Sequence, residues 1–369
     1  MEIYYIIHIA VFASLVFEFF PLRFKKGLLV LWCLFFTLFG GLRWKIGGDW
    51  DQYYGHFLNV SWDNIFNYDR YGNGQEVLEP GFVFFNVFIR TLFGEFYIYN
   101  LIVVGFIQFS YYKFCNYFFS KHPLLCYSFL MLLSSNYFAV RAGFGLGITY
   151  WCWKFIKERK LLPYLVIIFI AYSVHRQAIV LLPCYWIGKV KLKSKWLLII
   201  YLLIAFFSYK LQAYFTLFTL QFSGTVADAA YGYTQNETEG FSGVSYAGWA
   251  LNYFFLIIYL YIRRKKNLYD DFWNNTLLNC VIIYNAIFMV FSNGMGDLSR
   301  LSVLYFPVQC ILLIYSFLYF VESKNKVISM LAVIFFLSYY IYRLPYTWSG
   351  YFFKDACVPY KTILDYGAE

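Results

Sequence analysis

Ionisable residues at the ends of apolar segments are the features of this sequence most able to do chemistry. A charged side chain at membrane depth costs about 2.5 to 3.5 kcal/mol on insertion scales, so it needs a partner, a water-filled cavity or a ligand. Arginine offers phosphate oxygens a bidentate fork, and histidine or aspartate accepts a proton. The set therefore fits a site that binds pyrophosphate beside a general base. Its members are Arg43, Asp49, Arg141, His175, Arg176 and Arg300.

Several of these residues also have a purely structural interpretation. Arg43 also fits an anchor at the membrane interface. His175 also fits a hydrogen bond to a neighbouring helix, and Arg300 also fits an ion pair with Asp297 one turn earlier. His175 and Asp49 compete for the role of general base. Asp49 also fits a second role, in which it orients Arg43. The residues alone leave these alternatives open.

The sequence gives little support for a metal or a cofactor. Clustered carboxylates are few and include GDWD at 48–51 and the pair at 270–271, and the eight cysteines show no CxxC spacing. GFGLG at 143–147 is not a nucleotide-binding fingerprint, since Gly143 and Gly147 form a small-xxx-small pair typical of helix packing. We therefore expect no metal, no cofactor and no disulfide.

Composition indicates a membrane protein. Of 369 residues, 61% are hydrophobic, 25% are aromatic and only 14% are charged, which is more apolar surface than one soluble core hides. Apolar runs near the ~20 residues that cover about 30 Å of hydrocarbon recur from end to end. We expect an all-α polytopic integral membrane protein with roughly 11–12 transmembrane helices in a single integral domain over residues 1–369.

The basic residues predict which connectors face the cytoplasm, because positively charged connectors stay on that side. They account for the net charge of +10, so we expect no nucleic-acid partner. Five apolar segments lie between the first two basic connectors, yet an even number of crossings must separate them. The shortest segment, 81–93, contains Arg90 and is predicted to be re-entrant. The basic connectors are 21–26, 154–160, 188–195, 263–266 and 322–326.

The remaining charge then gathers on the outer face. This face holds two longer loops, at about 43–80 and 211–245, together with all the candidate site residues. Several arginines and a base at one membrane surface fit a lipid-linked pyrophosphate substrate.

Five short sequence elements share this outer placement. They are R-x-x-x-G-x-D-x-x-x-Y at Arg43, Gly47, Asp49 and Tyr53; E-P-G-F at 79–82; Arg141 at the start of a glycine-rich helix; Tyr172, His175, Ala178 and Pro183; and Arg300 with Tyr305 and Phe306. In order and placement these elements resemble the EpsG and Wzy-type polysaccharide polymerases, over about residues 40–310.

The resemblance implies a multi-pass glycosyltransferase of the bacterial inner membrane, with its active site facing the periplasm or cell exterior. Such an enzyme polymerises undecaprenyl-pyrophosphate-linked oligosaccharide units into O-antigen, capsule or exopolysaccharide without a cofactor. The implied partners are that lipid-linked oligosaccharide, membrane lipid and a chain-length regulator protein. The implied catalytic residues are His175 and Asp49. The implied substrate-binding residues are Arg43, Arg141, Arg176 and Arg300.

Three other functions stay open. An O-antigen ligase acting on the same lipid carrier would use the same arginines and the same kind of base. A membrane O-acyltransferase also combines histidine and arginine, but it takes its acyl donor from the cytoplasm, away from the predicted side of His175. A polysaccharide transporter usually contains internal repeats, and this sequence shows no convincing repeat.

Overall fold

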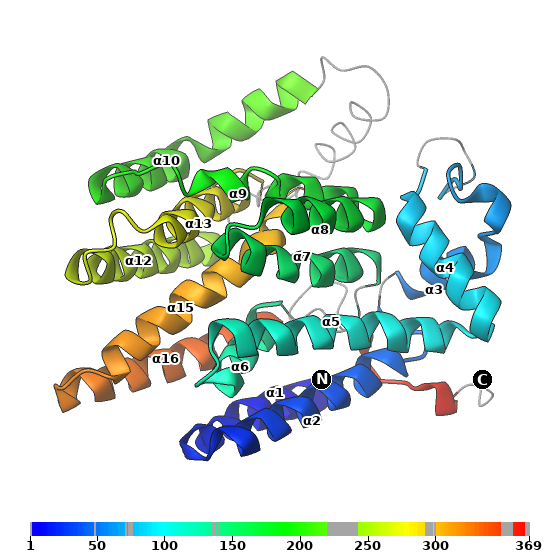
Figure 1. Ribbon diagram of the computed structural model, residues 1–369, viewed down its shortest axis with the longest axis horizontal. Helices are drawn as coiled ribbons and strands as arrows, with labels where there is room; N and C mark the ends of the chain where they lie inside the picture. Colours follow the sequence, from blue (N-terminus) through cyan, green and yellow to red (C-terminus); the bar gives the residue numbers. More distant parts are fainter. Residues whose placement is uncertain are drawn as a thin grey trace. The chain divides into compact units, whose positions relative to one another are not determined.

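The fold is helical throughout the part of the chain that the structure describes (Figure 1). This computed structural model describes residues 2–47, 49–70, 72, 77–134, 138, 140–219, 243–291, 298, 300–347 and 357–365. Within them the β-type contacts are two isolated bridges, Arg43–Thr362 and Asp69–Val77, and no sheet forms. The predicted all-α class is confirmed.

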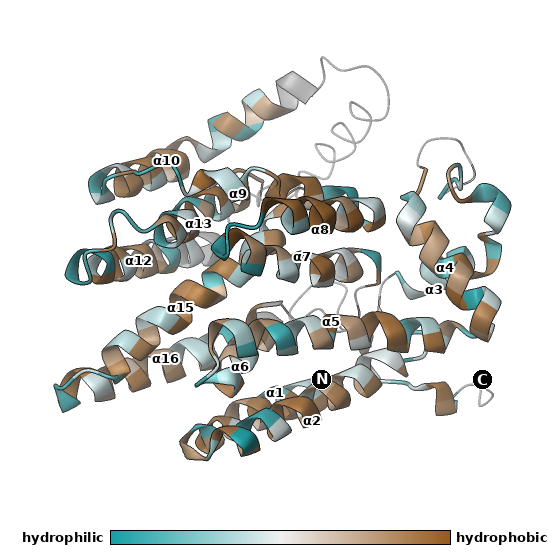
Figure 2. Ribbon diagram, viewed as in Figure 1, coloured by the Kyte–Doolittle hydropathy of each residue, from teal (hydrophilic) through white to brown (hydrophobic). Residues whose placement is uncertain are grey.

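Several helices have the length and composition of membrane spans. Figure 2 shows that α8 (Leu161–Val174) is almost wholly hydrophobic, whereas the connector between α12 (Gly243–Lys265) and α13 (Phe272–Phe291) is hydrophilic. The chain is therefore a multi-pass membrane protein, and the roughly 11–12 crossings stay a prediction. Among the described residues four runs are long and apolar enough to cross: Ser194–Phe215, Phe272–Phe291, Arg300–Val321 and Lys326–Leu344.

The chain divides by its internal contacts into two compact units, so the single domain over 1–369 stays a prediction. The first unit combines Met1–Ile179 with Met330–Glu369, and the second is Val180–Ser329. The helices of the first unit are α1 (Glu2–Ala13), α2 (Leu22–Gly41), α3 (Trp50–Asn59), α4 (Pro80–Phe93), α5 (Phe96–Phe118), α6 (Pro123–Ser134), α7 (Arg141–Lys157), α8 and most of α16 (Lys326–Thr347). In it α2 packs against α5, α5 against α7 and α7 against α8.

A glycine allows α7 to lie close to α5. A Cβ atom at Gly147 would be 3.1 Å from Cγ1 of Ile107, tighter than ordinary van der Waals contact. The packing role predicted for this glycine is confirmed.

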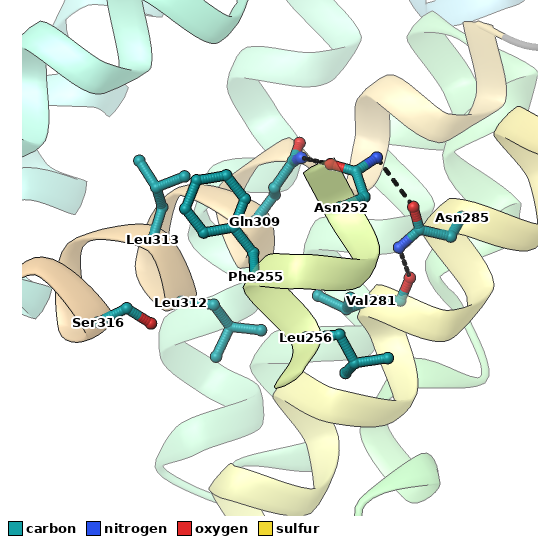
Figure 3. A pocket seen from close by; sticks show the side chains of 9 residues that line it. All are labelled: Asn252, Phe255, Leu256, Val281, Asn285, Gln309, Leu312, Leu313 and Ser316. Carbon is teal, nitrogen blue, oxygen red and sulfur yellow. Dashed lines mark hydrogen bonds between the residues drawn. The ribbon is translucent and has the colours of Figure 1, made fainter. Parts of the chain in front are cut away.

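Amide side chains link the helices of the second unit (Figure 3). Gln309 Nε2 donates a hydrogen bond to Asn252 Oδ1 at 3.1 Å, and Asn252 Nδ2 donates to Asn285 Oδ1 at 3.0 Å. Such bonds stabilise helix contacts in an apolar solvent. They join α12, α13 and α15 (Phe306–Val321), and the same unit holds α9 (Cys184–Ile187), α10 (Ser194–Thr219) and the 3-10 helix η4 (Arg300–Tyr305).

The two basic connectors of the first unit lie at the same end of that unit. Lys25 Nζ donates to the carbonyl of Lys121, in the turn just after α5, at 2.5 Å. Lys157 Nζ lies 5.3 Å from the centre of the Tyr117 ring, which is also at the end of α5. The shared end agrees with the prediction that both connectors face the same side of the membrane.

The three basic connectors of the second unit also lie together. Arg263 Nη1 donates to the carbonyl of Leu192 at 3.0 Å, and Lys266 Nζ lies 5.3 Å from the centre of the Tyr319 ring. The grouping agrees with the predicted loop assignment within each unit. Which face is cytoplasmic stays a prediction.

The helix α4 matches the segment predicted to be re-entrant. Its 14 residues span about 21 Å, less than the ~30 Å of a hydrocarbon core. Pro80 begins the helix and Gly94, with φ of 75°, ends it. Arg90 Nη1 donates to the carbonyl of Phe57 at 3.0 Å, so the charge within the segment binds the backbone of α3.

Both predicted outer loops contain helix. The first, 43–80, includes α3 and a 3-10 helix at Trp62–Asn64. The second begins inside α10, because α10 continues to Thr219, and residues 220–242 lie outside the described part of the chain.

Candidate active site

A buried carboxylate, Glu79, joins the ends of three helices of the first unit. Its Oε2 accepts a hydrogen bond from Nη1 of Arg141 at 3.1 Å, at the start of α7. Its Oε1 accepts the backbone N–H of Arg176 at 3.1 Å and lies 3.8 Å from Nδ1 of His175, just after α8. Three residues predicted from sequence as site residues therefore meet around a fourth. We call these four residues the Glu79 cluster.

The charge of Glu79 is fixed by its neighbours. Burial alone would raise the pKa of this carboxyl, but the interaction with His175, the charge of Arg141 and the backbone N–H of Arg176 lower the pKa to about 2. Only 5% of Glu79 is exposed, so its interactions are weakly screened by water. Glu79 is therefore an anion at any physiological pH.

The E-P-G-F element explains how Glu79 reaches this position. Pro80 supplies the fixed φ that suits the first turn of α4, and Glu79 is the N-cap. A Cβ at Gly81 would lie 2.7 Å from the carbonyl oxygen of Ser173, so only glycine allows α4 to begin against the end of α8. Phe82 is fully buried and anchors the same turn.

His175 is held between α8 and α7. Its backbone N–H donates to the carbonyl of Ala171 at 2.8 Å and ends α8. A Cβ at Gly145 of α7 would lie 2.7 Å from Cβ of His175, so the glycine leaves room for the imidazole. The side chain is 11% exposed, and Nε2 has no hydrogen-bond partner among the described residues. This nitrogen is itself buried.

The helix α3 places Tyr53 beside the Glu79 cluster. Burial raises the pKa of the Tyr53 phenol, and the charges of Arg141 and Asp49 are both close enough to act on it. The Tyr53 ring also contacts the ring of Phe82, with centres 5.9 Å apart. Asp49 itself is exposed at the N-cap of α3, one turn before Tyr53, and makes no side-chain capping bond.

Arg43 lies inside the fold rather than at its surface. Only 1% of the residue is exposed. Its guanidinium donates to the carbonyls of Gly40 and Phe138, the latter at 2.9 Å, and its backbone pairs with Thr362. Burial lowers the pKa of Arg43 to about 10, which still leaves it charged at neutral pH. Arg43 was predicted to bind phosphate at the membrane surface, whereas in the structure it is buried. Its backbone bridge to Thr362 joins the end of α2 to the C-terminal segment.

Two further predictions concern the glycine turn after α2 and the position of Arg300 in the second unit. Gly47 has φ of 104°, so this glycine makes the predicted turn, while Gly48 lies outside the described residues. Arg300 is exposed at the start of η4, in the second unit. Its predicted partner Asp297 also lies outside the described residues.

The sequence profile described as the EpsG family matches residues 26–362, which include the whole Glu79 cluster. The chain belongs to the EpsG family. This family is associated with exopolysaccharide biosynthesis. No curated protein and no solved structure matches the chain.

In this EpsG-family chain, sequence reasoning missed two residues that build the site. Glu79 was visible in the E-P-G-F element, but no charge partner for it is near in sequence. Gly145 was visible inside GFGLG, but its contact with His175 joins positions 30 residues apart. Among the described residues, no group of three His, Cys, Asp or Glu side chains gathers as a metal site requires.

Proposed function

We propose that this EpsG-family chain is a glycosyltransferase that polymerises undecaprenyl-pyrophosphate-linked oligosaccharide units at the outer surface of a bacterial inner membrane. The observation that carries this proposal is the Glu79 cluster, which gathers a carboxylate, a histidine and two arginines at the ends of α4, α7 and α8. The family's association with exopolysaccharide supports the same class of substrate.

The proposed reaction transfers the growing chain onto the incoming unit. A hydroxyl oxygen of the incoming lipid-linked unit bonds to the anomeric carbon of the growing chain. The bond from that carbon to the pyrophosphate oxygen breaks, and the lipid pyrophosphate leaves with the electron pair. The hydroxyl proton passes to a base. No nucleotide takes part, because the lipid pyrophosphate already activates the sugar.

His175 is the proposed base. The Glu79 carboxylate on its Nδ1 side favours the tautomer with a proton on Nδ1, which leaves Nε2 to accept the hydroxyl proton. The separation of 3.8 Å exceeds a hydrogen bond, and such contacts often shorten when substrate binds. Asp49, exposed on α3, stays the competing base.

Arginines stabilise the charge that develops on the departing pyrophosphate. The Arg141 guanidinium pairs with the Glu79 carboxylate, whereas the Arg176 guanidinium stands apart from that pair, so one positive charge remains for the substrate. Arg176 is exposed, and its Nη2 donates to the carbonyl of Val77 at 2.8 Å, which places it at the edge of the cluster. Arg300 is a further proposed ligand. Arg43 contributes by holding the end of α2 in place.

A genetic experiment tests the proposal and separates it from the ligase alternative. Deletion of the gene should leave surface polysaccharide as single units, and the wild-type gene should restore a ladder of chain lengths. His175→Ala should fail to restore the ladder, whereas His122→Ala, in the connector after α5, should restore it. A full ladder from His175→Ala at normal protein level would contradict the proposed base. Long chains that remain on the lipid carrier after deletion would indicate a ligase.

A further inference from the structure

A cavity of about 240 Å³ opens between the C-terminal ends of α5 and α7, at the other end of α7 from Arg141. Its lining combines aromatic rings with Lys113 of α5 and Lys154 of α7. Lys154 Nζ lies 5.5 Å from the centre of the Tyr117 ring, within the range of a cation–π contact. The cavity is therefore distinct from the Glu79 cluster and sits beside the basic connector 154–160.

Positive charge at this cavity exceeds the negative charge nearby. Lys113 and the connector KFIKERK at 154–160 together supply five basic residues and one acidic residue, Glu158. The Glu158 carboxylate pairs with Lys160 at 2.9 Å and also acts on Lys154. One carboxylate does not balance these cations, so the cavity favours an anion.

A hydrogen-bond acceptor lies in the same lining. Asn116 Nδ2 donates to the carbonyl of Tyr112 at 2.8 Å. Its Oδ1 is buried and has no hydrogen-bond partner among the described residues. A buried acceptor without a donor is costly, so a hydroxyl-bearing ligand gains from reaching it once the Asn116 side chain turns the closed atom toward the cavity. The lining thus pairs cations for a phosphate with an acceptor for a hydroxyl.

We propose that this cavity binds the headgroup of an anionic, hydroxyl-bearing phospholipid of the phosphatidylglycerol type. The phosphate lies near Lys113 and Lys154, and a glycerol hydroxyl donates to Asn116 Oδ1. The acyl chains follow the apolar surface beside the cavity, where Phe109 is 47% exposed and its ring centre is 5.9 Å from that of Trp151. Apolar flanks and a basic end of the bundle favour a lipid over a soluble anion.

Native mass spectrometry of the full-length protein in detergent tests the site directly. The protein is titrated with phosphatidylglycerol or phosphatidylcholine, and bound lipid is counted. Lys113→Ala with Lys154→Ala should weaken phosphatidylglycerol binding by about thirtyfold, the size expected from two lysines at a charged bilayer surface, and should leave phosphatidylcholine unchanged. The double arginine variant at the same positions should keep the affinity, which separates loss of charge from loss of folding.

Two controls define the outcome. Lys193→Ala with Lys195→Ala removes two exposed cations from another basic connector and should keep the affinity for phosphatidylglycerol. Asn116→Leu should reduce the preference for phosphatidylglycerol over phosphatidic acid, whose headgroup lacks the glycerol hydroxyls. Equal phosphatidylglycerol binding by wild type and the Lys113/Lys154 alanine variant would overturn the proposal. Displacement of the lipid by soluble glycerol phosphate at equal concentration would overturn it as well.

Discussion

Replacing Glu79 by glutamine should remove a stabilisation that depends on pH in a defined direction. The native pKa of Glu79 is lowered from 4.5 to about 2, because its neighbours favour the charged form over the cost of burial. A carboxyl whose pKa is lower in the folded state than in the unfolded state stabilises the fold at every pH above its unfolded-state pKa. That stabilisation is lost as the pH falls towards the folded-state pKa. The difference corresponds to about 3 kcal/mol at neutral pH.

Unfolding in SDS at pH 7 and pH 3 measures this term. Wild type should exceed Glu79→Gln by about 3 kcal/mol in free energy of unfolding at pH 7, and by about 1 kcal/mol at pH 3. Asp51→Asn removes the same charge from an exposed position on α3 and should change little at either pH. A gap for Glu79→Gln that is absent at pH 7, or that stays constant to pH 3, would refute the reasoning.

Other predictions concern packing, the buried arginine and topology. Gly145→Ala should lower the free energy of unfolding in SDS by about 1–3 kcal/mol and should lower polymerisation, because the added Cβ meets His175. Gly27→Ala should be tolerated, since no atom lies within 4 Å of the added Cβ, and equal behaviour of the two variants would contradict the packing account. Arg43→Lys should lower the free energy of unfolding by about 1–3 kcal/mol in the same assay, because lysine lacks the guanidinium fork that reaches two buried carbonyls. An unchanged free energy of unfolding would argue against a structural role for this arginine. Asn59→Cys should react with an impermeant thiol reagent added from outside, and Lys160→Cys should not. Background labelling should be low because all eight native cysteines are buried, and labelling of both variants from one side would reject the predicted topology.

The helical class and part of the site were predictable because their signals are local in sequence. Apolar length and basic connectors need no tertiary information, and the structure groups those connectors as expected within each unit. Arg141, His175 and Arg176 were chosen because ionisable residues at the ends of apolar segments are costly. The structure places these three around one carboxylate.

The rest depended on contacts between distant parts of the chain. Glu79 had no visible partner, because Arg141 is 62 residues away in sequence. Arg43 was expected at the surface, but the C-terminal segment covers it through the bridge to Thr362, which no local pattern indicates. Asp49 and Arg300 keep their predicted roles as proposals.

Polymerisation by the purified protein in liposomes tests the central claim most directly. The substrate is the purified lipid-linked repeat unit, and the products are the ladder of chain lengths and the released lipid pyrophosphate. Wild type should produce both without added nucleotide, and His175→Ala should bind the substrate but turn it over at least ~100-fold more slowly. Arg141→Ala should weaken substrate binding. Full activity of both variants at normal protein level, or no ladder from wild type, would contradict the account.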